Sequence, residues 1–289
     1  MPQPTVYPLE VKKVLKNLSF VKQTDLLVVE EPLEIRLGFG TADNRQQKSI
    51  SLTMRTPGND FELSLGFLFT EGILTSINQL HSIRYCENIS SEDSKENIVR
   101  VELKEGFTPD LKTLERHFYT HSSCGVCGKA SLESLSTLNC PINLPSYPLV
   151  STECILQLAE NIREEQTVFK HTGGLHAAAI FSPEGELLLL REDIGRHNAL
   201  DKLIGHFLYQ NQLPLSHHIL WLSGRVSFEM VQKALKAGIA VLVAVGAPSS
   251  LAVDLATQYQ MTLIGFAKEQ SFNIYSDFGR VIHFTSSKI

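Results

Sequence analysis

This chain of 289 residues has little cysteine, one tryptophan, no excess of positive charge and no long apolar run. Five cysteines, an odd number, argue against a disulfide scaffold at this size, and Cys86, Cys140 and Cys154 read as small buried hydrophobes. A net charge of −5 does not indicate a general nucleic-acid surface. No apolar run reaches membrane-spanning length, so we expect no membrane partner. Residues 1–13 lack the hydrophobic core of a secretory signal, which favours a cytoplasmic protein.

The overall composition of the chain is typical of a folded protein with a full hydrophobic core. Hydrophobic residues make up 43% of the chain and charged residues 20%, and the length suits one large domain or two smaller ones. Pro141, Pro145 and Pro148 interrupt the middle of the chain, where we place a linker. We therefore expect an N-terminal domain over residues 1–119, a cysteine loop and linker over 120–150, and a C-terminal domain over 151–289.

The N-terminal part reads as rich in strands, with one helix. That helix follows the turn Arg55-Thr56-Pro57-Gly58, takes Asn59 or Asp60 as its N-cap, and stops at Gly72. The expected strands are 26–37, 47–54, 83–86 and 98–103.

The C-terminal part alternates more regularly, in the order helix, strand, strand, helix, strand, helix, strand, helix, strand. Such alternation predicts parallel strands joined by helical crossovers, after a hairpin that turns at Pro183-Glu184-Gly185. The expected ranges are 152–165, 174–182, 186–191, 198–209, 218–222, 227–237, 239–245, 249–259 and 261–266. Together the two parts predict an α+β protein.

Cys124 and Cys127 form the most distinctive short motif of the chain. Glycines follow both thiols and leave the backbone free, while Lys129 begins a stretch that reads as a helix start. A helix N-terminus and nearby positive charge both lower the pKa of a thiol and favour the reactive thiolate. His117 and His121 could add charge or transfer protons. The motif therefore predicts a thiol that does chemistry.

Three functions of this thiol pair compete on the residues alone. A sulfur relay needs an exposed thiol on a mobile loop, and the loop composition fits. A zinc site could use His121, Cys124 and Cys127, although a structural zinc site usually takes four ligands and His117 or a distant residue would have to supply the fourth. A thioredoxin-like redox pair would follow a strand inside a βαβ unit, whereas this motif lies between the two expected domains.

Three strand-to-helix turns of the C-terminal part could hold an anion: residues 193–198, 223–227 and 246–250. Free backbone N–H groups at a helix N-terminus attract phosphate or carboxylate, and such turns lie on the ligand-binding edge of an α/β sheet. Arg196 and Arg225 add side chains suited to phosphate. The plainer interpretation is that Ser227 and Ser249 are ordinary N-caps. None of the turns matches a Walker P-loop or a dinucleotide glycine motif.

Several long segments together resemble the formate dehydrogenase accessory sulfurtransferase (FdhD) family, from about Val28 to Tyr275. These segments are 55–58 with 61–68, 123–128, 172–179, 191–202, 223–225 and 247–250. The resemblance implies that a cysteine desulfurase loads Cys124 with a persulfide, that Cys127 assists, and that the sulfur passes to the molybdenum or tungsten of a bis-molybdopterin guanine dinucleotide cofactor. Apo formate dehydrogenase would be the recipient, and a homodimer is implied. With the resemblance, the relay is favoured over zinc.

The resemblance also implies where the guanine nucleotide, or GDP as its analogue, would bind. That segment maps to Phe266, Ala267, Lys268, Glu269, Gln270 and Ser271. Where the family is expected to carry an Arg-Gly pair, this chain has Lys268-Glu269. Lysine keeps one charge but loses the bidentate fork of arginine, and Glu269 adds a negative charge.

The family's C-terminal fold is similar to that of cytidine deaminases, which implies a three-layer α/β domain here. In deaminases, His-x-Glu and Cys-x-x-Cys at two helix starts hold zinc. The matching positions carry His197-Asn198-Ala199 and residues 223–227, so both the acid/base glutamate and the cysteines are missing. We expect no metal here, and a former zinc pocket, with Arg196, His197 and Arg225, that has become a cofactor cradle. His176 reads as structural. A non-catalytic carrier or chaperone of the cofactor, with a structural zinc at the cysteine loop, is the alternative.

Overall fold

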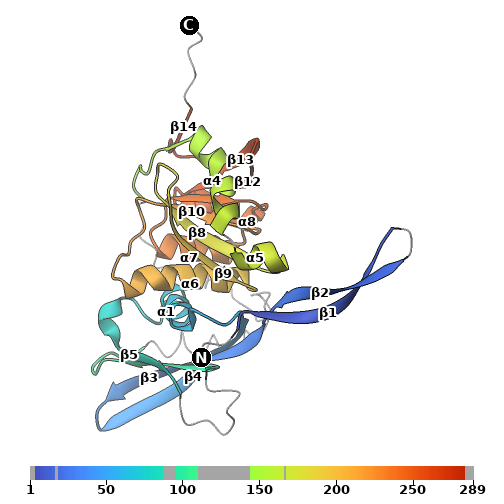
Figure 1. Ribbon diagram of the computed structural model, residues 1–289. Helices are drawn as coiled ribbons and strands as arrows, with labels where there is room; N and C mark the ends of the chain where they lie inside the picture. The colour runs from blue at the N-terminus through green and yellow to red at the C-terminus, as the bar shows by residue number, and fades with distance from the viewer. Residues whose placement is uncertain (1–3, 17–18, 87–95, 110–143, 166, 284–289) are drawn as a thin grey trace.

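The computed structural model describes residues 4–16, 19–86, 96–109, 144–165 and 167–283. They form a mixed α+β protein with two main sheets, one in each half of the chain (Figure 1). Across these residues, no helix has the length and apolar character needed to cross a lipid bilayer.

The N-terminal half is built on a four-stranded sheet in the order β4-β3-β6-β5. β3 pairs antiparallel with β4 and parallel with β6, and β5 pairs antiparallel with β6. The bounds are β3 Glu31–Thr41, β4 Asn44–Arg55, β5 Leu80–Tyr85 and β6 Ile98–Leu103. Alternate residues of β3 are apolar and buried, which sets the core face of the sheet, and the helix α1 (Asp60–Thr70) packs on that face.

A separate hairpin precedes this sheet and reaches away from the body of the molecule (Figure 1). Its strands are β1 (Val6–Val14) and β2 (Phe20–Val28), and we call it the arm. The sequence predicts one strand over 26–37, which is wrong. β2 ends at Val28 and β3 begins at Glu31, because the chain changes sheets between them. β1 was not expected.

The C-terminal half contains a six-stranded sheet in the order β13-β12-β11-β10-β8-β9. β10, β11 and β12 are parallel, as the alternation of strands and helices predicted, and β8, β9 and β13 run antiparallel to their neighbours. The bounds are β8 His176–Phe181, β9 Leu187–Asp193, β10 Ile219–Leu222, β11 Val241–Ala244, β12 Thr262–Lys268 and β13 Ser271–Ser276. β13 was not predicted.

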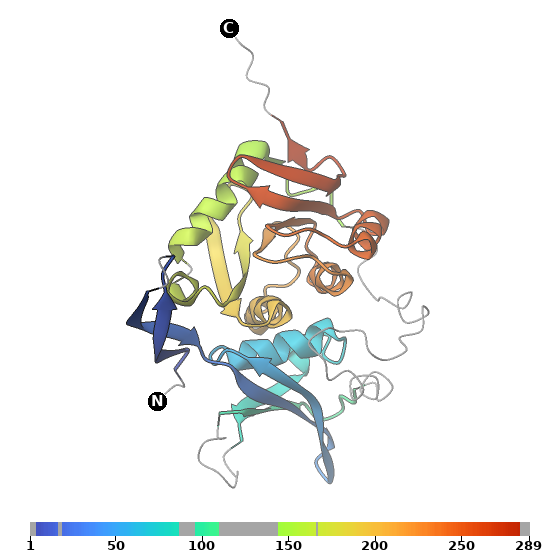
Figure 2. The same ribbon diagram turned by 90° about the vertical axis from the view of Figure 1, so that its right-hand side faces the viewer.

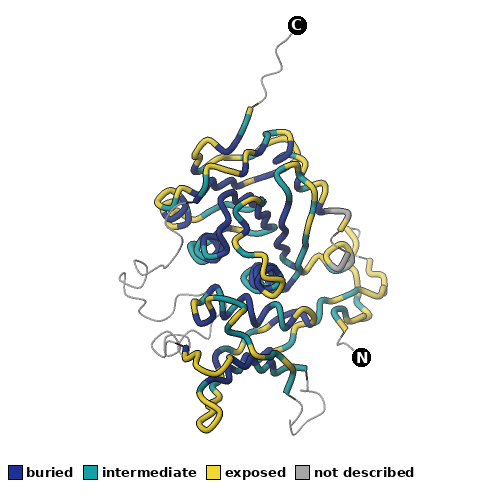
Figure 3. Tube along the Cα trace, turned by 90° about the vertical axis from the view of Figure 1, so that its left-hand side faces the viewer, coloured by how far each residue is buried: buried dark blue, intermediate teal, exposed yellow. Residues whose placement is uncertain are grey.

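Helices cover both faces of this sheet and make three layers (Figure 2). One face carries α4 (Thr152–Glu165), and the other carries α6 (Arg196–Tyr209), α7 (Phe228–Lys236) and α8 (Ser250–Gln258). The sheet strands and the helix sides that face them are buried, as the dark segments of Figure 3 show. Short elements complete the described chain: η1 Ile77–Gln79, β7 Val150–Ser151, α5 Thr167–Thr172 and β14 Val281–Ile282.

The two halves meet where α1 crosses α6. Gly66 and Gly205 allow this close approach, since a Cβ on Gly66 would lie 1.8 Å from the Asp201 carbonyl oxygen and a Cβ on Gly205 would lie 1.8 Å from the Glu62 carbonyl oxygen. Two helices can come this close only where neither has a side chain at the contact. The glycine pair therefore sets the distance between the two halves.

The start of α1 differs from the expected capping. Asn59 occupies the N-cap position with φ 57° and makes no capping bond through its side chain. Asp60 instead accepts hydrogen bonds from buried Arg55, at 3.0 Å from Nε and 2.9 Å from Nη2. Of the two serine caps considered, Ser249 accepts a bond from the Ala252 N–H, whereas Ser227 makes no such bond. Gly238 ends α7 with φ 77°, as predicted.

Candidate functional site

The turns that follow β10 and β11 lie beside residues 265 and 266 of β12. The Gly246 N–H donates to the Gly224 carbonyl at 3.2 Å, and the Phe266 N–H donates to the Gly246 carbonyl at 3.3 Å. A Cβ on Gly246 would lie 2.6 Å from the Arg225 nitrogen, and one on Gly265 would lie 2.9 Å from Pro248 Cδ. We call Gly224, Gly246 and Gly265 the glycine ledge, in which a side chain at Gly246 or Gly265 would meet neighbouring atoms at less than 3.0 Å.

The turn at the start of α6 is built differently from the one the sequence suggested. The Ile194 N–H donates to Thr56 Oγ1 at 3.2 Å, and the Gly195 N–H donates to Asp193 Oδ1 at 2.8 Å. Both N–H groups are therefore used within the protein and are not available to an anion. The expectation of free N–H groups at this turn is wrong for these two residues.

Asp193 holds this turn against the N-terminal half. Its buried carboxylate lies 2.7 Å from Lys202 Nζ, and it also accepts from the Thr56 N–H at 3.2 Å and from Asn198 Nδ2 at 3.1 Å. Lys202 Nζ donates further to the Thr56 carbonyl at 2.9 Å. Two of the long sequence segments, 55–58 and 191–202, thus meet in one buried polar junction.

Arg196, His197 and Arg225 gather near His176, and we call these four residues the basic cradle. Burial lowers the pKa of His176, and the positive charges of Arg196, His197 and Arg225 lower it further. The negative charge of Asp193 raises this pKa in part. A Cβ on Gly224 would lie 3.2 Å from His176 Nδ1 and 3.8 Å from Arg196 Cδ. The site therefore joins the glycine ledge and carries several like charges at close range.

One donor of the basic cradle lacks an acceptor. The Nε atom of Arg196 is buried and has no hydrogen-bond partner among the described residues. A buried donor without an acceptor is costly, and an anionic ligand or bound water would supply one. This atom is the feature of the site that most directly suggests an anionic group.

A carboxylate balances part of this charge. His197 Nε2 lies 2.9 Å from Glu229 Oε2, and Glu229 stands in the first turn of α7. The contact with His197 lowers the pKa of Glu229, against the effect of burial. Sequence reasoning missed Glu229, since a glutamate in the first turn of a helix is common and nothing in its neighbours marks it.

The expected nucleotide segment lies partly on the ledge and partly beyond it. Phe266 has φ 52° and is 42% exposed, next to Gly246, whereas the Ala267 side chain is buried in the core between the sheet and α4. Lys268, Glu269, Gln270 and Ser271 are exposed around the turn between β12 and β13. The structure brings Phe266 to the ledge, while residues 268–271 lie further along, around the exposed turn.

Cys124 and Cys127 lie outside the described residues, as do His117, His121 and Lys129. Their predicted chemistry stays a prediction. Among the residues that the structure does describe, no three His, Cys, Asp or Glu side chains come together in a group that could hold a metal ion.

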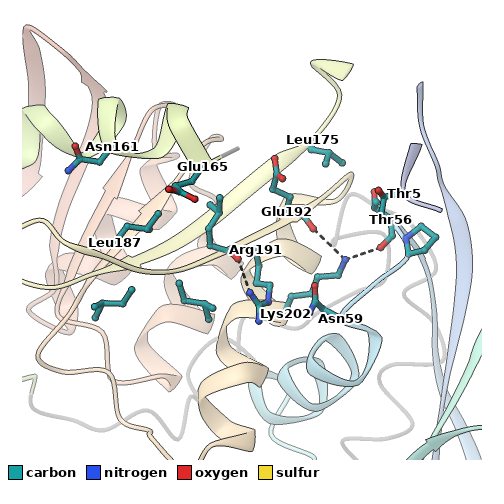
Figure 4. Close-up of a pocket in the computed structure, with 14 residues that line it drawn as sticks. Thr5, Thr56, Asn59, Asn161, Glu165, Leu175, Leu187, Arg191, Glu192 and Lys202 are labelled. Carbon is teal, nitrogen blue, oxygen red and sulfur yellow. Dashed lines mark hydrogen bonds between the residues drawn. The ribbon is translucent and has the colours of Figure 1, made fainter. Parts of the chain in front are cut away.

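A hollow of about 620 Å³ opens elsewhere, along the edge strand β9 (Figure 4). Thr56, Pro57 and Asn59 contribute to its wall, so the turn before α1 faces this hollow, while Arg55 is buried against Asp60. The two cations in its wall are already paired, Arg191 with Glu62 and Lys202 with Asp193. The hollow therefore lacks the uncompensated positive charge that distinguishes the basic cradle.

The fold and this site define a mixed α+β protein with a basic cradle at the carboxyl edge of its larger sheet. The chain belongs to the FdhD/NarQ family, whose model matches residues 28–282. Similar proteins include the sulfur carrier protein FdhD of Streptomyces coelicolor, 50% identical over 277 residues that cover 94% of this chain and 95% of that protein. The sulfur carrier protein FdhD of Sulfurisphaera tokodaii is 42% identical, with 95% of this chain and 100% of that protein covered.

A solved structure shares the fold. The crystal structure of a candidate formate dehydrogenase accessory protein from Desulfotalea psychrophila has a TM-score of 0.73 and 20% sequence identity, and covers 96% of this chain and 100% of that one. The shared architecture extends over both halves of the molecule.

Proposed function

We propose that this protein is a sulfur carrier that serves formate dehydrogenase as a sulfurtransferase. Its relatives at 50% and 42% identity are sulfur carrier proteins. In the proposed reaction, the Cys124 thiolate attacks the outer sulfur of a cysteine desulfurase persulfide. The sulfur–sulfur bond of that persulfide breaks, the desulfurase cysteine leaves as a thiolate, and Cys124 becomes the persulfide. Cys127 assists or relays.

The recipient of the sulfur is the metal of a bis-molybdopterin guanine dinucleotide cofactor, molybdenum or tungsten, bound here as substrate. The single observation that supports a binding site for it is the basic cradle, with the buried Nε of Arg196 still lacking an acceptor among the described residues. Arg196 and Arg225 would pair with phosphate groups of the dinucleotide, because a guanidinium forms charge-assisted bonds to phosphate. Glu229 would hold the ring of His197 in position.

The guanine end would lie at the segment from Phe266 to Ser271. Phe266 is exposed beside the glycine ledge, where an aromatic ring can stack on a base. Lys268, Gln270 and Ser271 would offer further polar groups, and Glu269 would limit the affinity for an anion. GDP is the natural probe of this end.

We also propose a fold for the C-terminal domain, bounds for both domains, a cellular location and an oligomeric state. The three layers and the mixed sheet of the C-terminal half are compatible with a cytidine deaminase-like domain, and in this proposal the former zinc pocket would serve as the cradle without a metal. The domains would run over 1–119 and 151–289, with the cysteine loop and linker between them. The protein would act in the cytoplasm as a homodimer, between a cysteine desulfurase and apo formate dehydrogenase.

Intact-protein mass tests the sulfur step. After incubation with a cysteine desulfurase and cysteine, the wild type should gain one reducible sulfur atom, about 32 Da, and Cys124→Ala should not. Cys154→Ala is the matched control, because Cys154 is buried and should not take part. A wild type that gains no sulfur, with stoichiometric zinc in the same sample, would instead support a non-catalytic carrier with a structural zinc at the cysteine loop.

Binding of GDP tests the cradle separately. Arg196→Gln and Arg225→Gln should each weaken GDP binding at least about tenfold by calorimetry, since each removes a charged donor to phosphate. Lys104→Gln, a charge change on an exposed residue of the other half, serves as the control. Equal affinity in all four proteins would remove the cradle from the proposal and leave the sulfur step untouched.

A further inference from the structure

The arm carries an apolar face that nothing in the described structure covers. Cross-strand partners in β1 and β2 point to the same side, so the register assigns one set of residues to each face. We define the outer face of the arm by four cross-strand pairs, Tyr7 with Leu27, Leu9 with Asp25, Val11 with Gln23, and Lys13 with Val21. Tyr7 is 57% exposed, Val21 50%, Leu9 42% and Leu27 41%.

The opposite face of the arm already has contacts. At the base, Val28 packs against Gly174, where a Cβ would come within 3.0 Å of Val28 Cγ2. Further along, Lys22 pairs with Glu10 at 3.1 Å, and Lys12 lies 5.5 Å from the centre of the Phe20 ring. This inner face meets the body at its base, while its apolar pair near the tip, Val14 and Phe20, is 68% and 63% exposed. The outer face carries the larger share of the exposed apolar side chains of the arm: Tyr7, Leu9, Leu15, Val21 and Leu27. An isolated two-stranded hairpin is marginal in water, so an apolar outer face calls for a partner surface.

We propose that the outer face of the arm binds the outer face of a second copy of this chain, with the two arms antiparallel and related by a two-fold axis. The axis would pass at the pair of Val11 and Gln23, in the middle of the face. The row of Leu9 and Asp25 then lies over the row of Lys13 and Val21 of the second copy, because both rows are two residues from the axis along the arm.

The charges on the outer face fit this arrangement. The four pairs contain one cation, Lys13, and one anion, Asp25, and they stand on opposite sides of the central row. The two-fold axis therefore brings each Lys13 near the other copy's Asp25, so the interface contains two such pairs of opposite charge. Leu15 continues the face, since its N–H donates to the Ser19 carbonyl at 2.8 Å, and it would cover the Tyr7 and Leu27 row of the second copy. A partner surface with charge of one sign would leave Lys13 or Asp25 unmatched.

The family model matches from residue 28, but relatives aligned over 94% and 95% of this chain extend into the arm. The arm interface rests on the proposed homodimer, and it is separate from the sulfur step and from the cradle. Each strand is 9 residues long, or roughly 30 Å, which gives a contact at the small end of stable interfaces. We therefore expect monomer and dimer to be in equilibrium, with the dimer fraction rising over the protein concentrations that sedimentation velocity can cover.

Sedimentation velocity over a concentration series tests this interface by charge reversal. Lys13→Asp and Asp25→Lys should each raise the dimer dissociation constant at least tenfold, because each places two pairs of like charges in contact. The double variant Lys13→Asp/Asp25→Lys restores the complementarity and should regain most of the wild-type affinity.

Lys12→Asp is the matched control, since it makes the same change on the inner face and should leave association unchanged. All these positions are exposed, so circular dichroism should report an intact fold in every variant. A wild type that stays monomeric at every concentration would overturn the proposal. So would a dimer whose affinity is the same in both single variants, because its interface would then lie elsewhere.

Discussion

Replacing Lys202 by methionine should destabilise the protein strongly, because it leaves a buried carboxylate without its cation. The side chain of Lys202 is 2% exposed and that of Asp193 is 0% exposed, and the two charged groups lie 2.7 Å apart. Methionine keeps the length and most of the volume of lysine, so the change removes the charge with little loss of packing. Water cannot reach Asp193 to replace the ammonium group.

The size of the effect follows from the other bonds to Asp193. Removing one member of a buried pair costs about 3–5 kcal/mol. Three further donors remain on this carboxylate, from Thr56, Gly195 and Asn198, so the lower end of that range applies. We expect a loss of about 3 kcal/mol in the free energy of unfolding, which corresponds to a fall of roughly 6–12 °C in Tm for a chain of this size.

Urea unfolding followed by circular dichroism measures this loss, and Lys22→Met is the matched control. Lys22 pairs with Glu10 on the arm, where the two side chains are 63% and 67% exposed, so its loss should cost less than about 0.5 kcal/mol. The double variant Asp193→Asn/Lys202→Met should regain more than half of the lost stability. A loss below about 1 kcal/mol in Lys202→Met, or a double variant no more stable than the single one, would refute the reasoning.

Three further predictions concern the helix crossing and the basic cradle. Gly205→Ala puts a Cβ 1.8 Å from the Glu62 carbonyl oxygen, so it should lower the free energy of unfolding by about 3 kcal/mol in urea titrations, despite the better helix propensity of alanine. Glu229 has a lowered pKa in the folded protein, so its carboxylate stabilises the fold above its ordinary pKa near 4.5 and this contribution fades as the pH falls further; the stability difference between wild type and Glu229→Gln should shrink below pH 4.5. His176 should titrate below its ordinary pKa of 6.5 by NMR, and bound GDP should move that pKa upward, because an anion offsets the neighbouring positive charges.

The sequence predicts the C-terminal sheet well because each element carries its own signal. The buried strand over 239–245 is a continuous apolar run, and Gly238 marks the end of the helix before it. Pro183 and Gly185 predict the turn of the hairpin that β8 and β9 form. β13 gives no such signal, since it is a mostly polar edge strand whose pairing with β12 is interrupted by two register shifts.

The N-terminal features are harder to predict because they depend on distant contacts. Residues 26–29 are apolar and residues 33–37 alternate, so the range was expected to form one strand, yet the chain leaves one sheet and enters another at residues 29 and 30, a choice made by tertiary pairing. Asn59 does occupy the N-cap position, but its side chain makes no capping bond, and the buried pair of Arg55 and Asp60 holds the turn instead. Local capping preference yields here to a buried ion pair.

In the candidate site too, the residues with a local sequence signal could be predicted, and the contacts between distant residues could not. Arg196, His197 and Arg225 were predicted from their turns, and the structure does bring them together around His176. The contact of His197 with Glu229 joins α6 to α7, residues 32 positions apart, and no sequence spacing reveals it. The free N–H groups expected at residues 194 and 195 are used by Thr56 and by Asp193, which only the fold brings into place.

Helix α6 links the basic cradle to the junction between the two halves. Its first residues, Arg196 and His197, belong to the cradle, and Lys202 joins the buried junction with Asp193. One turn later, Gly205 lies against the backbone of α1. A helix is stiff over this length, so a ligand that shifts Arg196 would have to move the contact with the N-terminal half as well. We therefore expect ligand binding at the cradle to be coupled to the position of the N-terminal half through this helix, so variants at the junction should weaken GDP binding without touching the ligand.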